Sequence, residues 1–326
     1  MSASGGTKAV VAALAANLGI AVTKFVAFGL TMSSSMLAEA IHSVVDSGNQ
    51  MLLLIGGRRA TREATARHPF GYGRERYIYA FIVSVVLFSV GGLFALYEGY
   101  HKIAHPEPIT SWHWVPLAVL GSSIVLEGFS FRTAIRETNQ IRGRASWIQF
   151  IRHARVPELP VILLEDFAAL IGLVLALFGV GLTLYTGDGL FDGIGTAAIG
   201  VLLVAVAVVL AVEMKSLLIG ESATDEVVSA ISEAILSGTE VSRIIHLRTV
   251  HLGPEELLVA AKIAVRHDDT AAVISRNIDA VESRVRSAVG IARVIYLEPD
   301  LDRTPDAAGT ATPAQAPAPG TRAGIS

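Results

Sequence analysis

The chain has 326 residues, of which 52% are hydrophobic and 17% are charged, with a formal net charge of −3 at pH 7. A water-soluble protein of this size could hide so many apolar side chains only with difficulty, so the composition indicates a membrane protein. The nearly neutral charge gives no reason to expect nucleic acid as a partner, and the absence of cysteine excludes disulfides and thiolate metal sites.

Six apolar stretches are each about 20 residues long, the length that crosses a hydrocarbon core of about 30 Å. They lie at roughly 8–30, 36–57, 77–100, 113–134, 160–183 and 190–213. We therefore expect a polytopic α-helical membrane protein in which residues 1–214 form six transmembrane helices. The first stretch is too long for the core of a signal peptide, so it is expected to be a retained helix.

Basic residues between the stretches predict the orientation, because cytoplasmic loops retain Lys and Arg during insertion. The second and fourth connections are rich in arginine, whereas the first and fifth have no basic residue. Both termini are therefore predicted to be cytoplasmic. Abundant arginine and alanine favour a bacterial source, and hence the inner (plasma) membrane.

Residues 135–159 form a long connection whose Trp147, Ile148, Phe150 and Ile151 predict a short helix at the membrane interface. After residue 215 the composition becomes that of a soluble domain. The patterns predict helices at 225–236 and 270–289 and strands at 243–252, 256–265 and 293–299. Residues 215–301 are thus expected to form a small cytoplasmic α+β domain of order αββαβ, ferredoxin-like, and the Ala- and Pro-rich residues 302–326 to be disordered.

The second stretch contains ionisable residues where lipid-facing residues would be apolar. Glu39, His42 and Asp46 are spaced i, i+3 and i+7, so they lie on one stripe of a helix, and Asn49 extends this stripe by a turn. Because an ionisable group in hydrocarbon is expensive, the stripe must face the protein interior or a wet cavity.

The fifth stretch supplies Glu165 and Asp166. A rise of about 1.5 Å per residue places Asp46 and Asp166 at one level near the membrane midplane, where transporter substrates bind. One imidazole and two or three carboxylates suit a divalent cation, with Zn²⁺ expected and Mn²⁺ or Fe²⁺ as alternatives. His42, Asp46 and Asp166 are the expected ligands, and no resident cofactor is expected.

The neighbouring polar residues have alternative interpretations. Glu39 is a structural or gate-lining residue, or a ligand. Glu165 is rotated by about 100° from Asp166 and either binds the ion, supports a ligand or carries protons. Glu127, in the fourth stretch, pairs helices or handles protons, and Asn49 is a further candidate ligand.

These residues resemble the cation diffusion facilitator family of divalent-metal transporters. The motifs are "AEAIHSVVDS" in the second stretch and "HPFGYGRER" before the third, together with six spans and a terminal αββαβ module. The resemblance implies a tetrahedral site of four ligands, yet the fourth position is Ile162, which cannot bind metal. This departure leaves Glu165, water and Glu127 as alternatives for the fourth ligand. The sequences "LLED" and "LEGFS" resemble the divergent branch that includes the mitochondrial zinc exporter of animals.

The resemblance also implies cytoplasmic metal sites and a homodimer formed through the terminal module. His68, His246 and His251 are candidate regulatory ligands, but Tyr72, Lys262 and Tyr296 stand where the family often has histidine. The expected function is metal efflux by proton antiport, because protons and the cation compete for the same side chains. An intramembrane metalloenzyme and a metal-sensing receptor are the alternatives from other classes.

Overall fold

The computed structural model of the chain describes residues 3–106, 109, 112–143 and 146–301. It divides into two compact units. The first comprises Met1–Thr224 and Thr249–Leu258, and the second comprises Asp225–Arg248 and Val259–Ser326. The predicted domain boundaries at 214 and 301 remain predictions.

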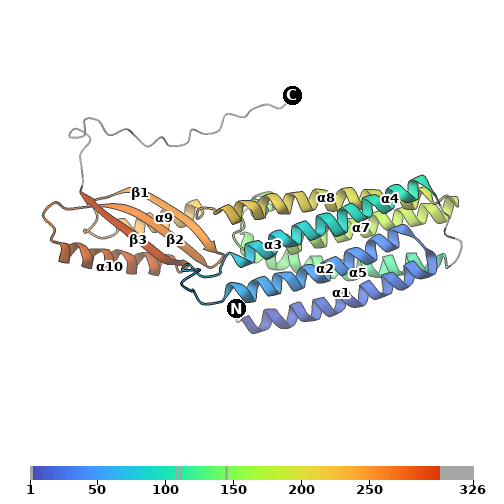
Figure 1. Cartoon of the computed structure of the whole chain (residues 1–326), viewed down its shortest axis with the longest axis horizontal. Helices are drawn as coiled ribbons and strands as arrows, with labels where there is room; N and C mark the ends of the chain where they lie inside the picture. Colours follow the sequence, from blue (N-terminus) through green and yellow to red (C-terminus); the bar gives the residue numbers. More distant parts are fainter. Residues whose placement is uncertain (1–2, 107–108, 110–111, 144–145, 302–326) are drawn as a thin grey trace, which may run out of the picture. The chain divides into compact units, whose positions relative to one another are not determined.

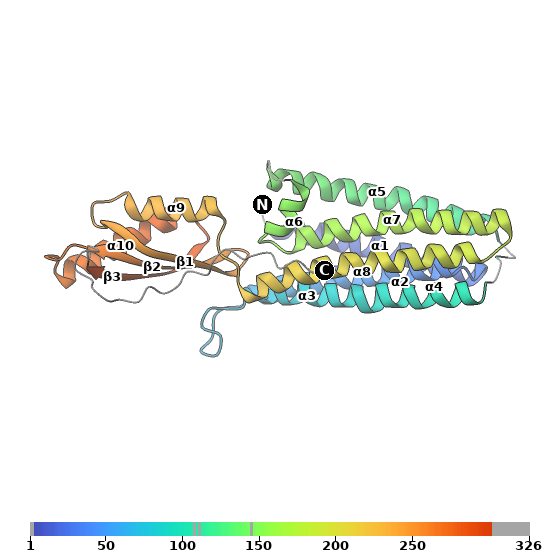
Figure 2. The same ribbon diagram turned by 90° about the horizontal axis from the view of Figure 1, so that it is seen from above.

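Long helices that lie side by side make up most of the first unit (Figures 1 and 2). They are α1 (Ala3–Thr31), α2 (Ser34–Ala60), α3 (Glu75–Val86), the π-helix η1 (Leu87–Leu93), α4 (Phe94–Ala104), α5 (Trp114–Arg142), α7 (Glu158–Thr186) and α8 (Leu190–Ile219). Helices α3, η1 and α4 follow one another directly and occupy the third predicted stretch. Each of the six predicted stretches is therefore helical.

Four helical segments of the described chain are long and apolar enough to cross a membrane. They are Glu75–Ala104, Trp114–Asn139, Glu158–Thr186 and Leu190–Ile219. Residues Asn17–Thr31 form a shorter apolar helix, and α2 is not among the four because its polar stripe and terminal arginines lower its hydropathy. The composition and length of the described helices therefore support four spans directly.

Helices α4 and α8 approach each other closely at glycines. A Cβ atom at Gly99 would lie 2.5 Å from the backbone nitrogen of Ala197, and one at Gly200 would lie 2.7 Å from that of Leu96. Small residues that let helix backbones meet are typical of helix packing in membranes. The π-helix η1 precedes this contact and was not predicted from the sequence.

The N-terminus of α2 is bound by a buried carboxylate from α8. Asp192 is fully buried and accepts hydrogen bonds from the backbone nitrogens of Ser34, at 2.8 Å, and Ser35, at 3.2 Å. The hydroxyls of Ser33 and Ser34 donate to the same carboxylate. Asp192 therefore caps α2 from a neighbouring helix and complements the positive end of its dipole.

A short helix, α6 (Trp147–His153), is present in the connection where an interfacial helix was predicted. Ser146 and Gln149 form a reciprocal capping box at its start, and the guanidinium of Arg142 lies 4.3 Å from the ring of Trp147. Ile148 is 69% exposed, as expected of a side chain that faces lipid. The prediction of a short helix in this connection is confirmed.

The terminal elements are α9 (Asp225–Leu236), β1 (Arg243–Gly253), β2 (Glu256–Val265), α10 (Ala271–Ala288) and β3 (Ala292–Leu301). The sheet has the order β1-β2-β3, and α9 packs against α10 (Figure 2). Buried Ile231, Ile235, Val281 and Val285 lie on the inner faces of the two helices. The predicted order αββαβ is confirmed, and the predicted tail 302–326 lies outside the described residues.

Candidate metal centre

The polar stripe of α2 faces the interior of the helix bundle. Glu39 and Asn49 are fully buried, His42 is 2% exposed and Asp46 is 8% exposed. The Nε2 atom of His42 lies 3.6 Å from Oδ2 of Asp46, one turn further along the helix. The expected orientation of this stripe is confirmed.

Several polar atoms of this stripe have no hydrogen-bond partner among the described residues. They include both ring nitrogens of His42 and Oδ1 of Asp46. Buried polar groups are nearly always paired, so each exception calls for an explanation. Here an imidazole and a carboxylate, both able to bind a metal, present unpaired lone pairs beside each other.

The two carboxylates of α7 bind different neighbours. Oε1 of Glu165 accepts a hydrogen bond of 2.5 Å from the amide of Asn49 on α2. Oδ2 of Asp166 accepts one of 3.0 Å from the hydroxyl of Ser130 on α5. The rotation of about 100° between consecutive residues explains this divergence. Asp46 interacts electrostatically with both carboxylates, so all three belong to one region of the bundle.

Glu39 forms a buried ion pair with Lys24 of α1. The ammonium of Lys24 lies 3.0 Å from Oε2 of Glu39 and donates a hydrogen bond of 2.8 Å to the hydroxyl of Ser43. The other oxygen, Oε1, is unpaired among the described residues. The carboxylate of Glu39 thus already has a counter-charge in Lys24, although one of its two oxygens has no partner among the described residues.

No group of three or more His, Asp or Glu side chains with a geometry that could hold a metal is found within the described ranges. The predicted joint ligation by His42, Asp46 and Asp166 therefore remains a prediction. His42 and Asp46 are adjacent, while Asp166 is turned toward Ser130.

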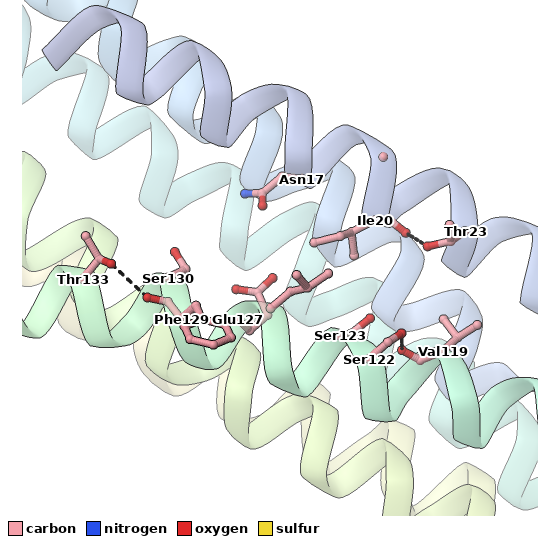
Figure 3. A pocket seen from close by; sticks show the side chains of 12 residues that line it. Asn17, Ile20, Thr23, Val119, Ser122, Ser123, Glu127, Phe129, Ser130 and Thr133 are labelled. Carbon is pink, nitrogen blue, oxygen red and sulfur yellow. Dashed lines mark hydrogen bonds between the residues drawn. The ribbon is translucent and has the colours of Figure 1, made fainter. Parts of the chain in front are cut away.

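Helices α1 and α5 enclose a cleft of about 840 Å³ next to this region (Figure 3). Asn17 and Thr23 line it from α1, and Ser123, Glu127 and Ser130 line it from α5. Figure 3 shows the carboxylate of Glu127 pointing from α5 toward α1. The cleft therefore includes Ser130, which binds Asp166, and Glu127, which interacts electrostatically with Asp46.

The three histidines predicted as regulatory ligands differ in their exposure and in their contacts. The ring of His68 packs against Tyr72 with a centroid distance of 4.8 Å, and both His68 and His246 are exposed. His251 is 3% exposed, and its Nδ1 lies 3.3 Å from the carbonyl oxygen of Gly253. Burial lowers the pKa of His251 below its ordinary value, which favours the neutral ring. Their role in metal binding remains a prediction.

Three polar residues of the site were not assigned to it from the sequence. Gln50 has a buried, unpaired Oε1, Ser130 holds Asp166, and Lys24 neutralises Glu39. The signal for Gln50 was available, because it lies four residues after Asp46 and continues the same stripe. The partners of Ser130 and Lys24 lie on other helices, which spacing within one helix does not reveal.

Comparison with known proteins adds the family. Residues 10–219 match the cation efflux transmembrane domain. The chain is 34% identical over 266 residues to the protein named proton-coupled zinc antiporter SLC30A9, mitochondrial, of Xenopus laevis, a match that covers 81% of this chain and 47% of that protein. It is 28% identical to metal tolerance protein C4 of Arabidopsis thaliana, over 78% of this chain and 56% of the other. It is 26% identical to the cation-efflux pump FieF of Pectobacterium atrosepticum, over 77% and 79%.

The chain is thus a helical membrane protein of the transporter class. It belongs to the cation efflux, or cation diffusion facilitator, family, with relatives named SLC30A9. Members of this family are transporters, so the alternative of an intramembrane metalloenzyme is set aside. The chain spans about half the length of the animal antiporters that it matches.

Proposed function

We propose that this chain exports a divalent cation, Zn²⁺ above Mn²⁺ or Fe²⁺, in exchange for protons. The observation that carries the proposal is the pair formed by His42 and Asp46. Both residues are buried, 3.6 Å apart, and present ring nitrogens and a carboxylate oxygen that no described side chain satisfies. A cation bound between them would supply the missing partner.

Asp166 is the proposed third ligand. Its hydrogen bond to Ser130 holds it beside α5, and its electrostatic interaction with Asp46 supports a role beside the pair. If Asp166 gave up its hydrogen bond to Ser130 and bound the cation instead, the site would gain a second carboxylate. Glu165, held by Asn49, and Glu127 are the candidates for the position that Ile162 leaves without a ligand. Asn49 and Glu39 would act mainly by holding Glu165 and by pairing with Lys24.

The nature of the ligands supports zinc and proton coupling. A nitrogen ligand together with carboxylates suits a borderline cation such as Zn²⁺ better than Mg²⁺ or Ca²⁺. His must be neutral and the carboxylates ionised to bind, so proton entry weakens binding and cation entry releases protons. The relatives named proton-coupled zinc antiporters support the same cargo and counter-ion.

The remaining expectations about the whole protein belong to this proposal. All six long helical segments would cross the membrane, including α1 and α2, since the stripe of α2 is turned inward. Both termini would be cytoplasmic, in a bacterial plasma membrane, although the similar animal antiporters are named mitochondrial. The chain would act as a homodimer.

Transport by the purified protein in proteoliposomes tests the proposal. Zn²⁺, Mn²⁺ and Fe²⁺ uptake would be measured under an imposed pH gradient with a cation-sensitive dye inside the vesicles. The expected result is saturable Zn²⁺ uptake that stops when the gradient is collapsed. Asp46→Ala should abolish this flux while the protein remains folded.

The control replaces an acid outside the site. Glu98 lies on α4, in the C-terminal part of the third helical stretch. Glu98→Ala should leave the flux close to that of the unchanged protein. Normal transport by Asp46→Ala would refute the assignment of the site. Preference for another cation, with Asp46 still required, would correct the cargo alone.

A further inference from the structure

The cleft between α1 and α5 has a carboxylate, that of Glu127, to which no described residue is hydrogen-bonded or ion-paired. Glu127 is 7% exposed and makes no hydrogen bond or ion pair with another described residue. Its side chain points into the cleft (Figure 3). A buried acid without a partner is costly, which indicates that the cleft admits something that stabilises it.

The other walls of the cleft offer neutral oxygens. Asn17 and Thr23 contribute from α1, and Ser123, Ser130 and Thr133 contribute from α5. The volume of about 840 Å³ is far above the roughly 10–15 Å³ that one water needs. Ile20, Val119, Leu126 and Phe129 line the rest of the cleft. A partly hydrated cation would therefore be held by the carboxylate and these neutral oxygens within an otherwise apolar cleft.

The cleft extends along α5 as far as the residues that contact the proposed metal ligands. Its residues on α5 run from Val119 to Thr133, which corresponds to about 21 Å along a helix. Helix α1 packs mainly against α2, and α5 packs mainly against α7, so the line between α1 and α5 is less closely packed. Ser130 at the wall of the cleft donates to Asp166, the proposed third ligand.

Electrostatics also favours a cation in this cleft. Glu127 interacts with Asp46, Glu39 and His42 of α2 and with Lys24 of α1. Lys24 is already paired with Glu39, which leaves the carboxylates of Asp46 and Glu127 to attract positive charge.

We propose that the α1–α5 cleft is a second cation-binding position, with Glu127 as its charged ligand, on the route to the His42–Asp46 site. This inference rests on the proposed function. One carboxylate and neutral oxygens form a weak site that leaves water on the cation, as a transit position requires. The cargo then gives up this water when it moves to the nitrogen and carboxylates of the main site.

The absence of natural cysteine makes the test direct. Thr133→Cys places a thiol in the cleft, and Val125→Cys places one on α5 where the native side chain is 58% exposed and outside the cleft. Full-length protein in proteoliposomes would be labelled with a charged, water-soluble thiol reagent. We expect labelling of Thr133→Cys and little labelling of Val125→Cys. Equal and slow labelling of both would show that the cleft holds lipid and would overturn the proposal.

Zn²⁺ itself is the probe of occupancy. It should slow the labelling of Thr133→Cys, and adding Glu127→Gln should raise the Zn²⁺ concentration for half-protection by about tenfold. Glu137→Gln, at an exposed position of α5, is the matched control and should change nothing. Protection that persists unchanged in Glu127→Gln would mean that the introduced thiol binds zinc, and would overturn the role of Glu127.

Zn²⁺ flux of each protein is measured in the same vesicles. This distinguishes failure of the proposed transport function from failure of the second cation position. Flux in the unchanged protein without protection of the cleft would refute the second position alone. Absence of Zn²⁺ flux in the unchanged protein would refute the proposed function and this inference with it. Elution as a single species in detergent and an unchanged unfolding temperature would show that the variants are folded.

Discussion

The ammonium of Lys24 lies 3.0 Å from Oε2 of Glu39, and both side chains are almost completely buried. The pair joins α1 to α2 one turn from His42. A buried pair of this kind contributes little net stability as a whole, but loss of one partner leaves a buried charge uncompensated. Each of the two side chains therefore depends on the other to compensate its charge inside the bundle.

Replacement of Lys24 by methionine should destabilise the folded protein. Glu39 would lose its counter-charge inside the bundle, at a cost of about 3–5 kcal/mol in the free energy of unfolding. The unfolding temperature in detergent measures this loss. The double variant Lys24→Met/Glu39→Gln removes both charges and should recover most of it. An equal loss in the single and double variants would show that the ion pair is not the cause.

The cap that Asp192 supplies to α2 gives a second prediction. Asp192→Ala removes a carboxylate that accepts two backbone and two hydroxyl hydrogen bonds, so it should cost about 2–3 kcal/mol of stability. Asp188, four residues earlier, is exposed and accepts from the backbone nitrogen of Leu190. Asp188→Ala should cost at most about 1 kcal/mol. Thermal unfolding of the two variants side by side would contradict the account if their losses were the same.

Alanine should have different effects at a glycine in the close contact between α4 and α8 and at a glycine with free space around it. Gly99→Ala places a methyl group 2.5 Å from the backbone of Ala197, so it should destabilise by about 1–3 kcal/mol or more. A Cβ at Gly181 of α7 meets nothing within 4 Å, so Gly181→Ala should be neutral or stabilise by up to about 1 kcal/mol. Unfolding temperatures distinguish the two, and tolerance of alanine at Gly99 would mean that the helices are further apart than described.

The buried ring of His251 predicts a dependence of stability on pH. Burial lowers the pKa of His251 in the folded protein, so the unfolded chain binds more protons near its ordinary pKa of about 6.5. Stability contributed by the neutral ring is present above that pKa and is lost as pH falls through it toward the lower pKa of the folded protein. The unfolding temperature should therefore fall between about pH 7 and pH 5, and less steeply in His251→Asn. His246→Asn, at an exposed site, is the control, and an identical slope in both variants would contradict this assignment.

Much of the fold could be predicted from hydropathy and periodicity alone. Each apolar stretch became a helix, and the αββαβ order followed from the change of period after residue 215. The stripe of Glu39, His42 and Asp46 was recognised because intramembrane charges are expensive wherever they face lipid. These properties are local, so the spacing of residues within one segment is enough to predict them.

The contacts between helices could not be predicted in this way. Asp192 was not singled out from the sequence, because its role in capping α2 depends on how α8 lies against the start of α2. Ser130 gave no signal of its own, because its bond to Asp166 depends on how α5 and α7 are rotated against each other. The π-helix Leu87–Leu93 also lacks a sequence pattern that separates it from the α-helices around it.

The central claim, that His42 and the carboxylates around it bind the transported cation, is tested most directly by X-ray absorption of the protein with one equivalent of Zn²⁺. The predicted spectrum has nitrogen and oxygen ligands at about 2.0–2.2 Å with scattering from an imidazole ring. This ring scattering should disappear in His42→Asn and persist in His101→Asn, whose histidine lies outside the site. An imidazole signal that survives His42→Asn unchanged would contradict the account.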